Sequence, residues 1–375
     1  MTYEPRECDA LRVETQVEPE AQPGISLEEL QLATRNHGMP LEALSYPLTP
    51  VGLHYLLIHY DIPQVVPEDW RLRIDGRVAR PLSLGLEELR ARPAAEVTVT
   101  MECAGNGRAR LEPRPISQPW LLEAVGTARW RGVPLRPLLE EAGLADDAVE
   151  VLFVGLDHGV EGGIEQDYAR SLPLAEALRD EVLLVYELNG APLPPQHGFP
   201  LRLVVPGWYG MANVKWLSRI TALAEPFTGY QQRQGYHLRA DPDEQGTPVT
   251  RMQPRALMLP PGIPDFLTRE RTVRLGACRL SGRAWSGWAP IAAVEVSTDG
   301  GVTWERAELE AAGELGPWAW RGWTFQWHPQ GPGPYVLCCR AADEAGNRQP
   351  IEQPWNVGGY VNNAVHRISV NVVTS

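Results

Sequence analysis

The sequence has little cysteine, no long apolar run and no excess of basic residues. Its five cysteines among 375 residues show no metal-finger spacing, and an odd number favours a reducing compartment over a disulfide framework. No apolar run approaches the ~20 residues that a membrane-spanning helix needs. The 47 acidic residues outnumber the 34 basic ones, and the net charge of -13 argues against sequence-independent nucleic-acid binding. We therefore expect neither a membrane nor a nucleic acid as partner.

Several recognisable signals are also missing. The first residues lack a basic segment followed by an apolar stretch, so no export signal is visible. We expect a cytoplasmic location, or a periplasmic one if a signal has been removed. There is no P-loop, no His-Glu-x-x-His and no serine nucleophile elbow. The run Gly105–Arg110 begins like a dinucleotide loop but has an arginine in place of the third glycine.

The length and the spacing of apolar residues favour two domains. A chain of 375 residues is long for a single core. Strands and short helices alternate up to about residue 224, which predicts a mixed α+β domain over residues 1–245. The later part consists of short strands separated by turn signals, which predicts an immunoglobulin-like β-sandwich over residues 246–375. The proline-containing stretch 235–262 is expected to be the linker.

Local patterns predict individual elements within this plan. Ser26 and Glu29 have the spacing of a capping box, and Asp75-Gly76 interrupts an alternating run as a hairpin turn would. The single Asp-box-like run 297–304 is interpreted as a structural turn. The expected elements are a capped helix, a hairpin, a second capped helix and a strand, at residues 26–34, 70–80, 83–92 and 96–101.

The last of these strands runs directly into Cys103. A cysteine between a strand end and a Gly-Asn-Gly turn lies where open sheets place ligands. Arg108 and Arg110 follow, and nearby positive charge lowers the pKa of a thiol, so we expect a thiolate. A thiolate is a nucleophile or a ligand for a soft or high-valent metal. The sequence places no histidine base beside Cys103, and a buried structural cysteine is the third possibility.

The run ECAGNGR, followed by Trp120 and TARWRGVPLRPLLEEAG, resembles the molybdenum-binding core of the sulfite oxidase family. The resemblance continues through VLLVYELNGAPLP, HGFPLRLVVPG and NVKWL. The later motifs VEVSTDGGVTW, WAWRGW and WNVGGYVNNAVHR resemble its immunoglobulin-like dimerisation domain. The whole resemblance covers roughly residues 33–372. The resemblance implies a molybdenum–molybdopterin cofactor, oxygen-atom transfer that oxidises sulfite to sulfate, and a homodimer.

The resemblance also implies roles for individual residues. Cys103 would be the single protein ligand of molybdenum. The cofactor would be lined by Arg35, Asn36, His37, Asp157, His197, Arg202, Val214, Lys215 and Trp216. The substrate pocket would be bordered by Arg35, Arg108, Trp120 and Tyr236. Taken alone, Arg202 and Lys215 could equally be surface charges, His197 a turn residue and Tyr236 a packing aromatic.

Two positions depart from the family pattern. Family members that oxidise sulfite have a second anion-binding arginine where this chain has Gly358, and usually an arginine where it has Gly107. Sulfite would then bind more weakly unless another cation, such as Arg110, Arg321 or Arg367, compensates. The alternative is a related molybdoenzyme for another small oxyanion or an S- or N-oxide, for example in nitrate reduction. A binding module without the metal is a further possibility.

The resemblance and the composition also bear on partners. No heme-binding or flavin module is recognisable, so electrons are expected to pass to a separate acceptor such as a cytochrome. Trp318, Trp320 and Trp323 are expected to be exposed and to support a dimer interface. The alternative is that they pack the core of the sandwich.

Overall fold

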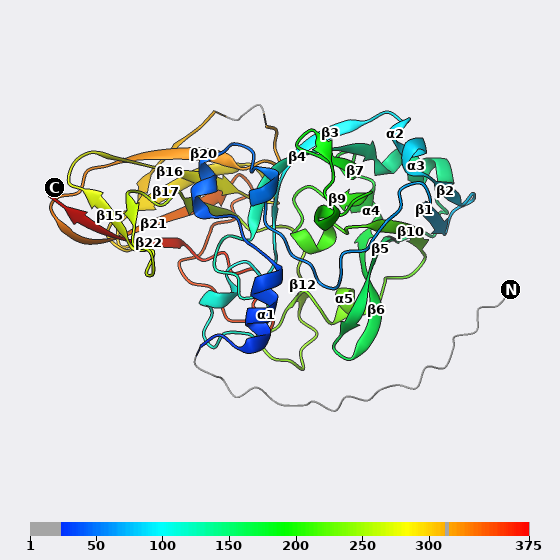
Figure 1. Ribbon diagram of the computed structural model, residues 1–375, viewed down its shortest axis with the longest axis horizontal. Helices are drawn as coiled ribbons and strands as arrows, with labels where there is room; N and C mark the ends of the chain where they lie inside the picture. The colour runs from blue at the N-terminus through cyan, green and yellow to red at the C-terminus, as the bar shows by residue number, and fades with distance from the viewer. Residues whose placement is uncertain (1–23, 312–314, 375) are drawn as a thin grey trace.

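The computed structural model describes residues 24–311 and 315–374, and in these it is built mainly from β-strands with few and short helices. Figure 1 shows two parts side by side: strands β1 to β10 with most of the helices, and a β-sandwich formed by the later strands. The predicted fold class, an α+β part followed by an immunoglobulin-like sandwich, is confirmed. The proposed boundary between residues 245 and 246 stays a prediction.

The first part contains two sheets. One has the strand order β2-β1-β10-β5-β6, with β1 and β10 parallel and the other pairs antiparallel. Its strands are β1 (Leu72–Gly76), β2 (Leu82–Leu84), β5 (Glu150–Glu161), β6 (Ile164–Pro173) and β10 (Leu217–Leu223). The other has the order β3-β4-β7-β8, with β9 paired to β7. Its strands are β3 (Ala95–Glu102), β4 (Val125–Pro134), β7 (Leu183–Leu188), β8 (Ala191–Pro192) and β9 (Arg202–Val204).

Short helices cover these sheets and fill the connections. The α-helices are α1 (Leu27–Arg35), α2 (Leu86–Arg90), α3 (Leu135–Ala142), α4 (Leu174–Ala177) and α5 (Tyr230–Arg233). The 3₁₀ turns are η1 (Leu41–Ser45), η2 (Val51–Leu53), η3 (Arg108–Arg110), η4 (Pro195–His197) and η5 (Gly210–Ala212). In α3, Leu135, Leu138, Leu139 and Ala142 share one buried face at helical spacing. No described helix is long and apolar enough to cross a membrane.

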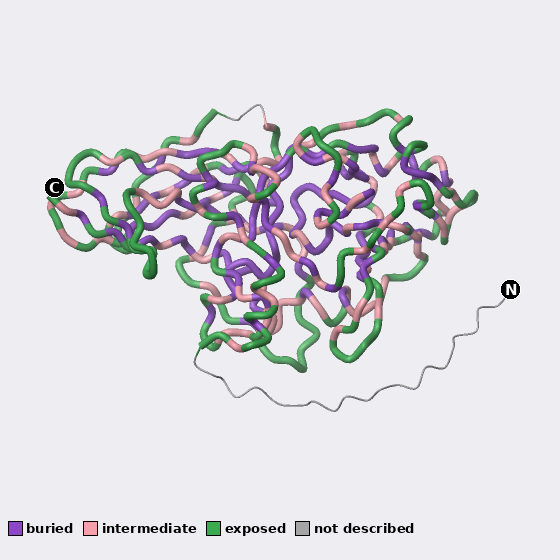
Figure 2. Tube along the Cα trace, in the orientation of Figure 1, coloured by how far each residue is buried: buried purple, intermediate pink, exposed green. Residues whose placement is uncertain are grey.

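The second part is a sandwich of two sheets with the orders β13-β16-β20-β19 and β14-β15-β22-β21-β17-β18. Its strands are β13 (Arg255–Met258), β14 (Ile263–Pro264), β15 (Arg271–Arg274), β16 (Cys278–Trp285), β17 (Ile291–Ser297), β18 (Glu305–Arg306), β19 (Glu308–Leu309), β20 (Arg321–Trp327), β21 (Gly333–Asp343) and β22 (His366–Val373). In β22, buried and outward-facing residues alternate, as a half-buried strand requires. Figure 2 shows the buried trace running through both parts and across their junction.

The local predictions succeed where the pattern is short-range. The helix after Ser26 has the full capping box with Glu29, and strand β3 spans the predicted residues. The hairpin is right in its first strand and wrong in its second, because the chain returns only at Leu82 after a longer connection. The second helix begins at Leu86 rather than Ser83, since Ser83 pairs in β2. In the Asp-box-like run, Asp299 accepts bonds from the backbone N–H of Val302 and Thr303, as a structural turn requires.

The predicted linker is more ordered than expected. It contains the two-stranded sheet of β11 (His237–Leu238) and β12 (Thr247–Pro248), and β13 of the sandwich begins within it.

The prediction of three exposed tryptophans is wrong for two of them. Trp320 and Trp323 are buried; Trp323 packs in the sandwich core, whereas Trp320 donates its indole N–H to Pro47 of the first part. Trp318 lies under the Arg179 guanidinium. These side chains join the two parts or fill the core, so they provide no argument for a dimer.

We predict that the folded state loses stability as the pH falls below about 6.5. His366 is buried in the sandwich, where Nδ1 accepts the backbone N–H of Met258, and burial lowers its pKa from 6.5 to about 3. The unfolded chain then binds a proton that the folded chain does not, so the free energy of unfolding decreases by up to about 1.4 kcal/mol per pH unit in this window.

Chemical denaturation of the wild type and of His366→Asn between pH 7 and pH 4, roughly the window set by the two pKa values, checks this. The variant should show a shallower pH dependence than the wild type. His328→Asn, at an exposed histidine, serves as the control and should keep the wild-type slope. An unaltered slope in His366→Asn would contradict the argument.

Candidate active site

Strand β3 delivers Cys103 to a buried turn. The Cys103 N–H donates to the Ala124 carbonyl just before β4, and its own carbonyl accepts the N–H of Asn106. The Asn106 side chain donates to Glu102 at 3.0 Å and to the Leu122 carbonyl at 3.1 Å. Gly107 then adopts a φ of 94°, a left-handed conformation that favours glycine. These bonds fix the position of the sulfur independently of any ligand.

Burial, rather than nearby arginine, dominates the pKa of the Cys103 thiol. The residue is 7% exposed, and burial raises its pKa above the ordinary value although the Arg108 guanidinium acts in the opposite direction. The expectation of a free thiolate set by Arg108 and Arg110 is therefore wrong, and Arg110 is exposed. A coordinated metal cation would deprotonate such a thiol outright.

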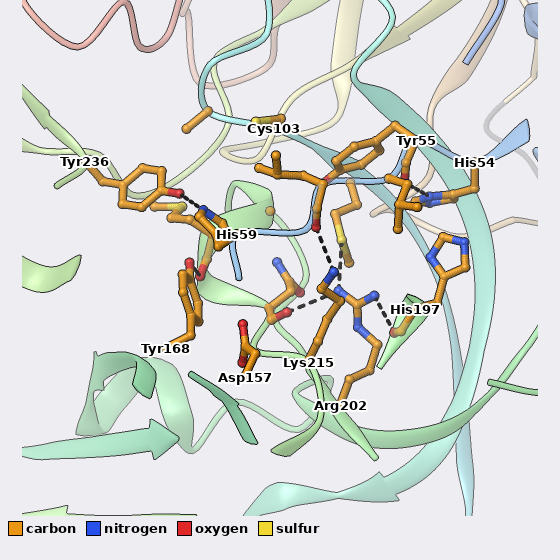
Figure 3. Close-up of a pocket in the computed structure, with 17 residues that line it drawn as sticks. His54, Tyr55, His59, Cys103, Asp157, Tyr168, His197, Arg202, Lys215 and Tyr236 are labelled. Atoms are coloured by element: carbon orange, nitrogen blue, oxygen red, sulfur yellow. Dashed lines mark hydrogen bonds between the residues drawn. The ribbon is translucent and has the colours of Figure 1, made fainter. Parts of the chain in front are cut away.

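Cys103 opens onto a pocket whose lining side chains are drawn in Figure 3. In the figure Cys103 and Tyr236 lie towards one end, and His197 and Arg202 towards the other. The lining is His54, Tyr55, Leu56, Leu57, His59, Met101, Cys103, Ala104, Asp157, Tyr168, His197, Arg202, Gly210, Met211, Asn213, Lys215 and Tyr236. Six of the residues singled out in the sequence are thus brought together: Cys103, Asp157, His197, Arg202, Lys215 and Tyr236.

Arg202 is a buried cation with no carboxylate in contact among the described residues. It is 4% exposed, and its guanidinium donates to the carbonyls of His197 at 3.0 Å and Asn213 at 3.1 Å. It also stacks on the Trp130 ring at 4.9 Å. Burial lowers its pKa to about 10, so it stays charged at neutral pH. A buried positive charge that is balanced only by carbonyls is suited to an anionic ligand.

Lys215 and Asp157 line the same region. The Lys215 ammonium donates to the carbonyls of Leu57 at 2.7 Å and Gln196 at 3.3 Å. Burial lowers the pKa of Lys215 and raises that of Asp157, and the attraction between the two groups opposes both shifts. Neither Arg202 nor Lys215 is a surface charge, so that alternative is excluded.

Unsatisfied polar atoms show what the pocket could hold. Asp157 Oδ1, Arg202 Nε and His54 Nε2 are buried and have no hydrogen-bond partner within the described chain. An acceptor, a charged donor and an imidazole nitrogen suit a heterocycle with donor and acceptor edges and an anionic group, as a pterin phosphate has. The described residues contain no group of three or more His, Cys, Asp or Glu side chains that could hold a metal. A metal here would need further ligands from its own cofactor.

Tyr236 faces the end of the pocket near Cys103. Its hydroxyl lies 2.8 Å from His59 Nε2, and burial lowers the pKa of His59 to about 3, so the imidazole is neutral. Burial likewise raises the pKa of Tyr236 well above 10, so the phenol keeps its proton. The backbone of Tyr236 has a φ of 53°, which is uncommon for a bulky residue. Such strained conformations concentrate at functional sites.

Other predicted residues do not line the pocket. Arg35 donates to the Tyr60 carbonyl, Asn36 accepts the Ile58 N–H, and His37 pairs with Leu56. These contacts join the three residues to the segment 56–60. His37 is also among the groups that lower the pKa of the pocket-lining His54 and His197. The expected contact of Arg35 with a substrate anion stays a prediction. Val214 and Trp216 are buried on either side of Lys215 and outside the lining.

Arg108 and Trp120 lie close to the Cys103 sulfur but behind the pocket surface. Both are buried. The Arg108 guanidinium donates to the carbonyls of Gly358 at 2.9 Å and Gln118 at 3.1 Å.

The possible replacements for the missing arginines lie elsewhere. Arg321 donates to carbonyls of Glu310 and Ile291, and Arg367 donates to Ile351. Neither Arg321 nor Arg367 lines the pocket, and the exposed Arg110 does not line it either. Glycine at 107 has a local reason, because a Cβ there would lie 2.7 Å from the Asn362 carbonyl oxygen.

Sequence reasoning missed several lining residues. His54, Tyr55 and His59 come from a segment whose irregular conformation follows no periodic pattern. One signal could have found them. His54 and His59 flank a mostly apolar stretch that contains no turn motif, and such a pair of histidines could have been proposed as site residues. Tyr168 is held by a hydrogen bond from its hydroxyl to the Met211 carbonyl, which only the folded chain reveals.

Comparison with known families agrees with this geometry. Residues 59–231 match the model of the oxidoreductase molybdopterin binding domain, and residues 265–373 match that of the Mo-co oxidoreductase dimerisation domain. The solved structure of the sulfane dehydrogenase SoxCD from Paracoccus pantotrophus is similar at a TM-score of 0.76 and 27% identity, covering 90% of this chain and 86% of that chain.

Curated relatives cover most of the chain. Sulfite oxidase of Gallus gallus is 37% identical over 338 residues, which make up 85% of this chain and 72% of that protein. Mitochondrial sulfite oxidase of Rattus norvegicus is 38% identical over 343 residues, 87% of this chain, and the chain spans only 62% of its length. Inducible nitrate reductase [NADH] 2 of Glycine max is 32% identical over 352 residues, 87% of this chain and 39% of that protein. Both domain models and these relatives together show that the chain belongs to the sulfite oxidase family of molybdopterin oxidoreductases.

Proposed function

We propose that the protein oxidises sulfite to sulfate, with water supplying the added oxygen and two electrons and two protons released for each sulfite. The electrons pass to a separate acceptor. One observation carries the proposal: the Cys103 thiol, the Arg202 guanidinium and the Lys215 ammonium face one pocket. A sulfur ligand and two cations in one cavity are what a metal–pterin phosphate requires.

In this proposal Cys103 is the one protein ligand of molybdenum, and the pterin is held by Asp157, His197, Arg202 and Lys215. The bound cofactor supplies two-electron redox chemistry and oxygen-atom transfer. The imidazole of His197 is neutral, because burial and the charge of neighbouring groups lower its pKa to about 2. It can therefore accept a hydrogen bond from the pterin ring, or donate one to it, without adding charge.

Substrate binding is assigned to the end of the pocket near Tyr236. We assign the ring proton of the neutral His59 to Nε2, which leaves the Tyr236 hydroxyl hydrogen free to donate to an oxyanion. Arg108 adds positive charge from behind Cys103, and Trp120 closes the wall beside it. Both groups are fixed before substrate arrives, so they stabilise charge without reorganisation.

The second candidate is reduction of another oxyanion, such as nitrate, or of an S- or N-oxide. Gly358 favours it, since the expected second arginine is absent there. A cation at about 4 Å is worth up to about 4 kcal/mol at an effective dielectric of 20, before desolvation. Nitrate reductases among the relatives support this alternative.

We predict that protein from a molybdenum-replete host contains about one molybdenum per chain, as a single thiolate-anchored site requires. Cys103→Ser should lose the metal because the soft anchoring ligand is gone. Elemental analysis measures both, with Cys278→Ser, at a partly exposed cysteine of the sandwich, as the control that keeps its metal. A full complement in Cys103→Ser would refute the assignment, and metal-free wild type would favour a binding module.

We predict that the loaded enzyme reduces ferricyanide with sulfite and does not reduce nitrate with a reduced dye. The reason is the direction of the proposed reaction, in which sulfite gives two electrons to the enzyme and the acceptor removes them. Steady-state assays with both substrate pairs on one preparation separate the two candidates. Nitrite formation without sulfite turnover would establish the reductive alternative.

We also propose a homodimer, which the match of residues 265–373 to a dimerisation domain supports. Size-exclusion chromatography with light scattering should give twice the chain mass of 41.6 kDa. A concentration-independent monomer would reject the dimer.

A further inference from the structure

The end of the pocket near Tyr236 is short of positive charge if only the expected residues are counted. Arg35 is bound to the Tyr60 carbonyl, and positions 107 and 358 hold glycine. An oxyanion beside Cys103 would then meet Arg108, with Lys215 acting on the same end across His59. The structure, however, contains another buried arginine at this end, Arg170 on β6.

Arg170 is a buried cation that makes no ion-pair contact among the described residues, although the Glu150 carboxylate is near enough to act on its pKa. It is 4% exposed, its Nη1 donates to the Gln231 carbonyl, and its buried Nε has no partner within the described residues. The nearby Glu150 carboxylate accepts instead from the Ser171 hydroxyl and the Phe227 N–H. Burying an unbalanced charge is costly, so its retention points to an anion that arrives from outside the chain.

Arg170 is coupled to the pocket through a stack of aromatic rings. Its Cζ lies 5.4 Å from the centre of the Tyr236 ring, and this ring lies 5.1 Å from that of Tyr360 at 32°. The Arg108 Cζ lies 5.2 Å from the Tyr360 ring on the way to Cys103. The four side chains are called here the Tyr236 column: Arg170, Tyr236, Tyr360 and Arg108.

The column also accounts for Gly358. A Cβ at position 358 would overlap the Tyr360 ring. That ring is held between Tyr236 and Arg108, so it has little freedom to move away. An arginine at 358 and this column are therefore mutually exclusive arrangements of the same space.

We propose that Arg170 is a positioning and specificity-determining residue, which replaces the arginine absent at position 358 by placing positive charge behind Tyr236 for an oxyanion beside Cys103. Its guanidinium acts through the stacked Tyr236 ring, which it orients towards the anion. The inference rests on the proposed anionic substrate. At an effective dielectric of 20, a charge about 8 Å away changes anion affinity by up to about thirtyfold before desolvation and screening, so we expect a loss of about tenfold.

The test uses molybdenum-loaded protein and sulfate as the probe, with binding measured by calorimetry beside metal content. Arg170→Met and Arg170→Gln remove the charge, the latter keeping a donor for the Gln231 carbonyl, and Arg170→Lys keeps the charge. Arg340→Met is the matched control, because Arg340 also stacks on an aromatic ring, Trp304, in the sandwich. Both uncharged variants should bind sulfate about tenfold more weakly, with KM for sulfite raised more than kcat is lowered. Arg170→Lys and Arg340→Met should stay near the wild type.

Three outcomes overturn the inference. They are unchanged sulfate affinity in either fully loaded uncharged variant, equal losses in Arg170→Lys and Arg170→Met, or failure of both uncharged variants to retain cofactor, which would make Arg170 structural. Sulfate binding that depends on Arg170 in a protein without sulfite turnover would support the inference and reject the proposed substrate. Sulfite turnover with unaltered sulfate binding in Arg170→Gln would support the proposed substrate and reject the inference about Arg170.

Discussion

The ion pair between Glu102 and Arg255 joins the two parts of the molecule at the residue before Cys103. Arg255 Nη1 lies 2.7 Å from Glu102 Oε1, although its N–H bonds are not aligned with that oxygen, and both side chains are at most 2% exposed. Glu102 also accepts bonds from the Trp285 indole at 2.9 Å and from Asn106 at 3.0 Å. Removing one partner of a buried pair typically costs about 3–5 kcal/mol. The sandwich therefore helps to hold the loop that carries the thiol.

Burial sets the electrostatics of the pocket more than the sum of nearby charges does. It keeps His54, His59 and His197 neutral and raises the pKa of Cys103 despite Arg108. The chain as a whole is acidic, yet the charges that line or back the pocket are mostly arginine and lysine. Screening at about 10 Å in 0.1 M salt separates these local charges from the distant acidic surface. An anion-binding site in an acidic protein is thus no contradiction.

The elements that the sequence predicted well depend on neighbouring residues. The capping box of Ser26 and Glu29 and the strand before Cys103 arise from contacts within a few positions. The failures are of the opposite kind. Ser83 lies in a strand because it pairs with β1. Trp320 packs against the first part of the molecule, where the Pro47 carbonyl accepts its indole N–H. The motif at Arg35–His37 was recognisable, but only the folded chain shows that Arg35 and Asn36 bind the backbone of segment 56–60.

By itself, the sequence determined the family, the order of the two folds and the identity of Cys103, because these reside in motifs of consecutive residues. It also identified Asp157, His197, Arg202, Lys215 and Tyr236, which the folded chain brings to one pocket. Only the tertiary structure decided which charges are buried without a partner, since burial depends on packing between distant segments. Tyr360 excludes a side chain at position 358, and Arg170 stands behind Tyr236, for this reason. Contacts between residues 108, 170, 236 and 360 have no signature along the chain.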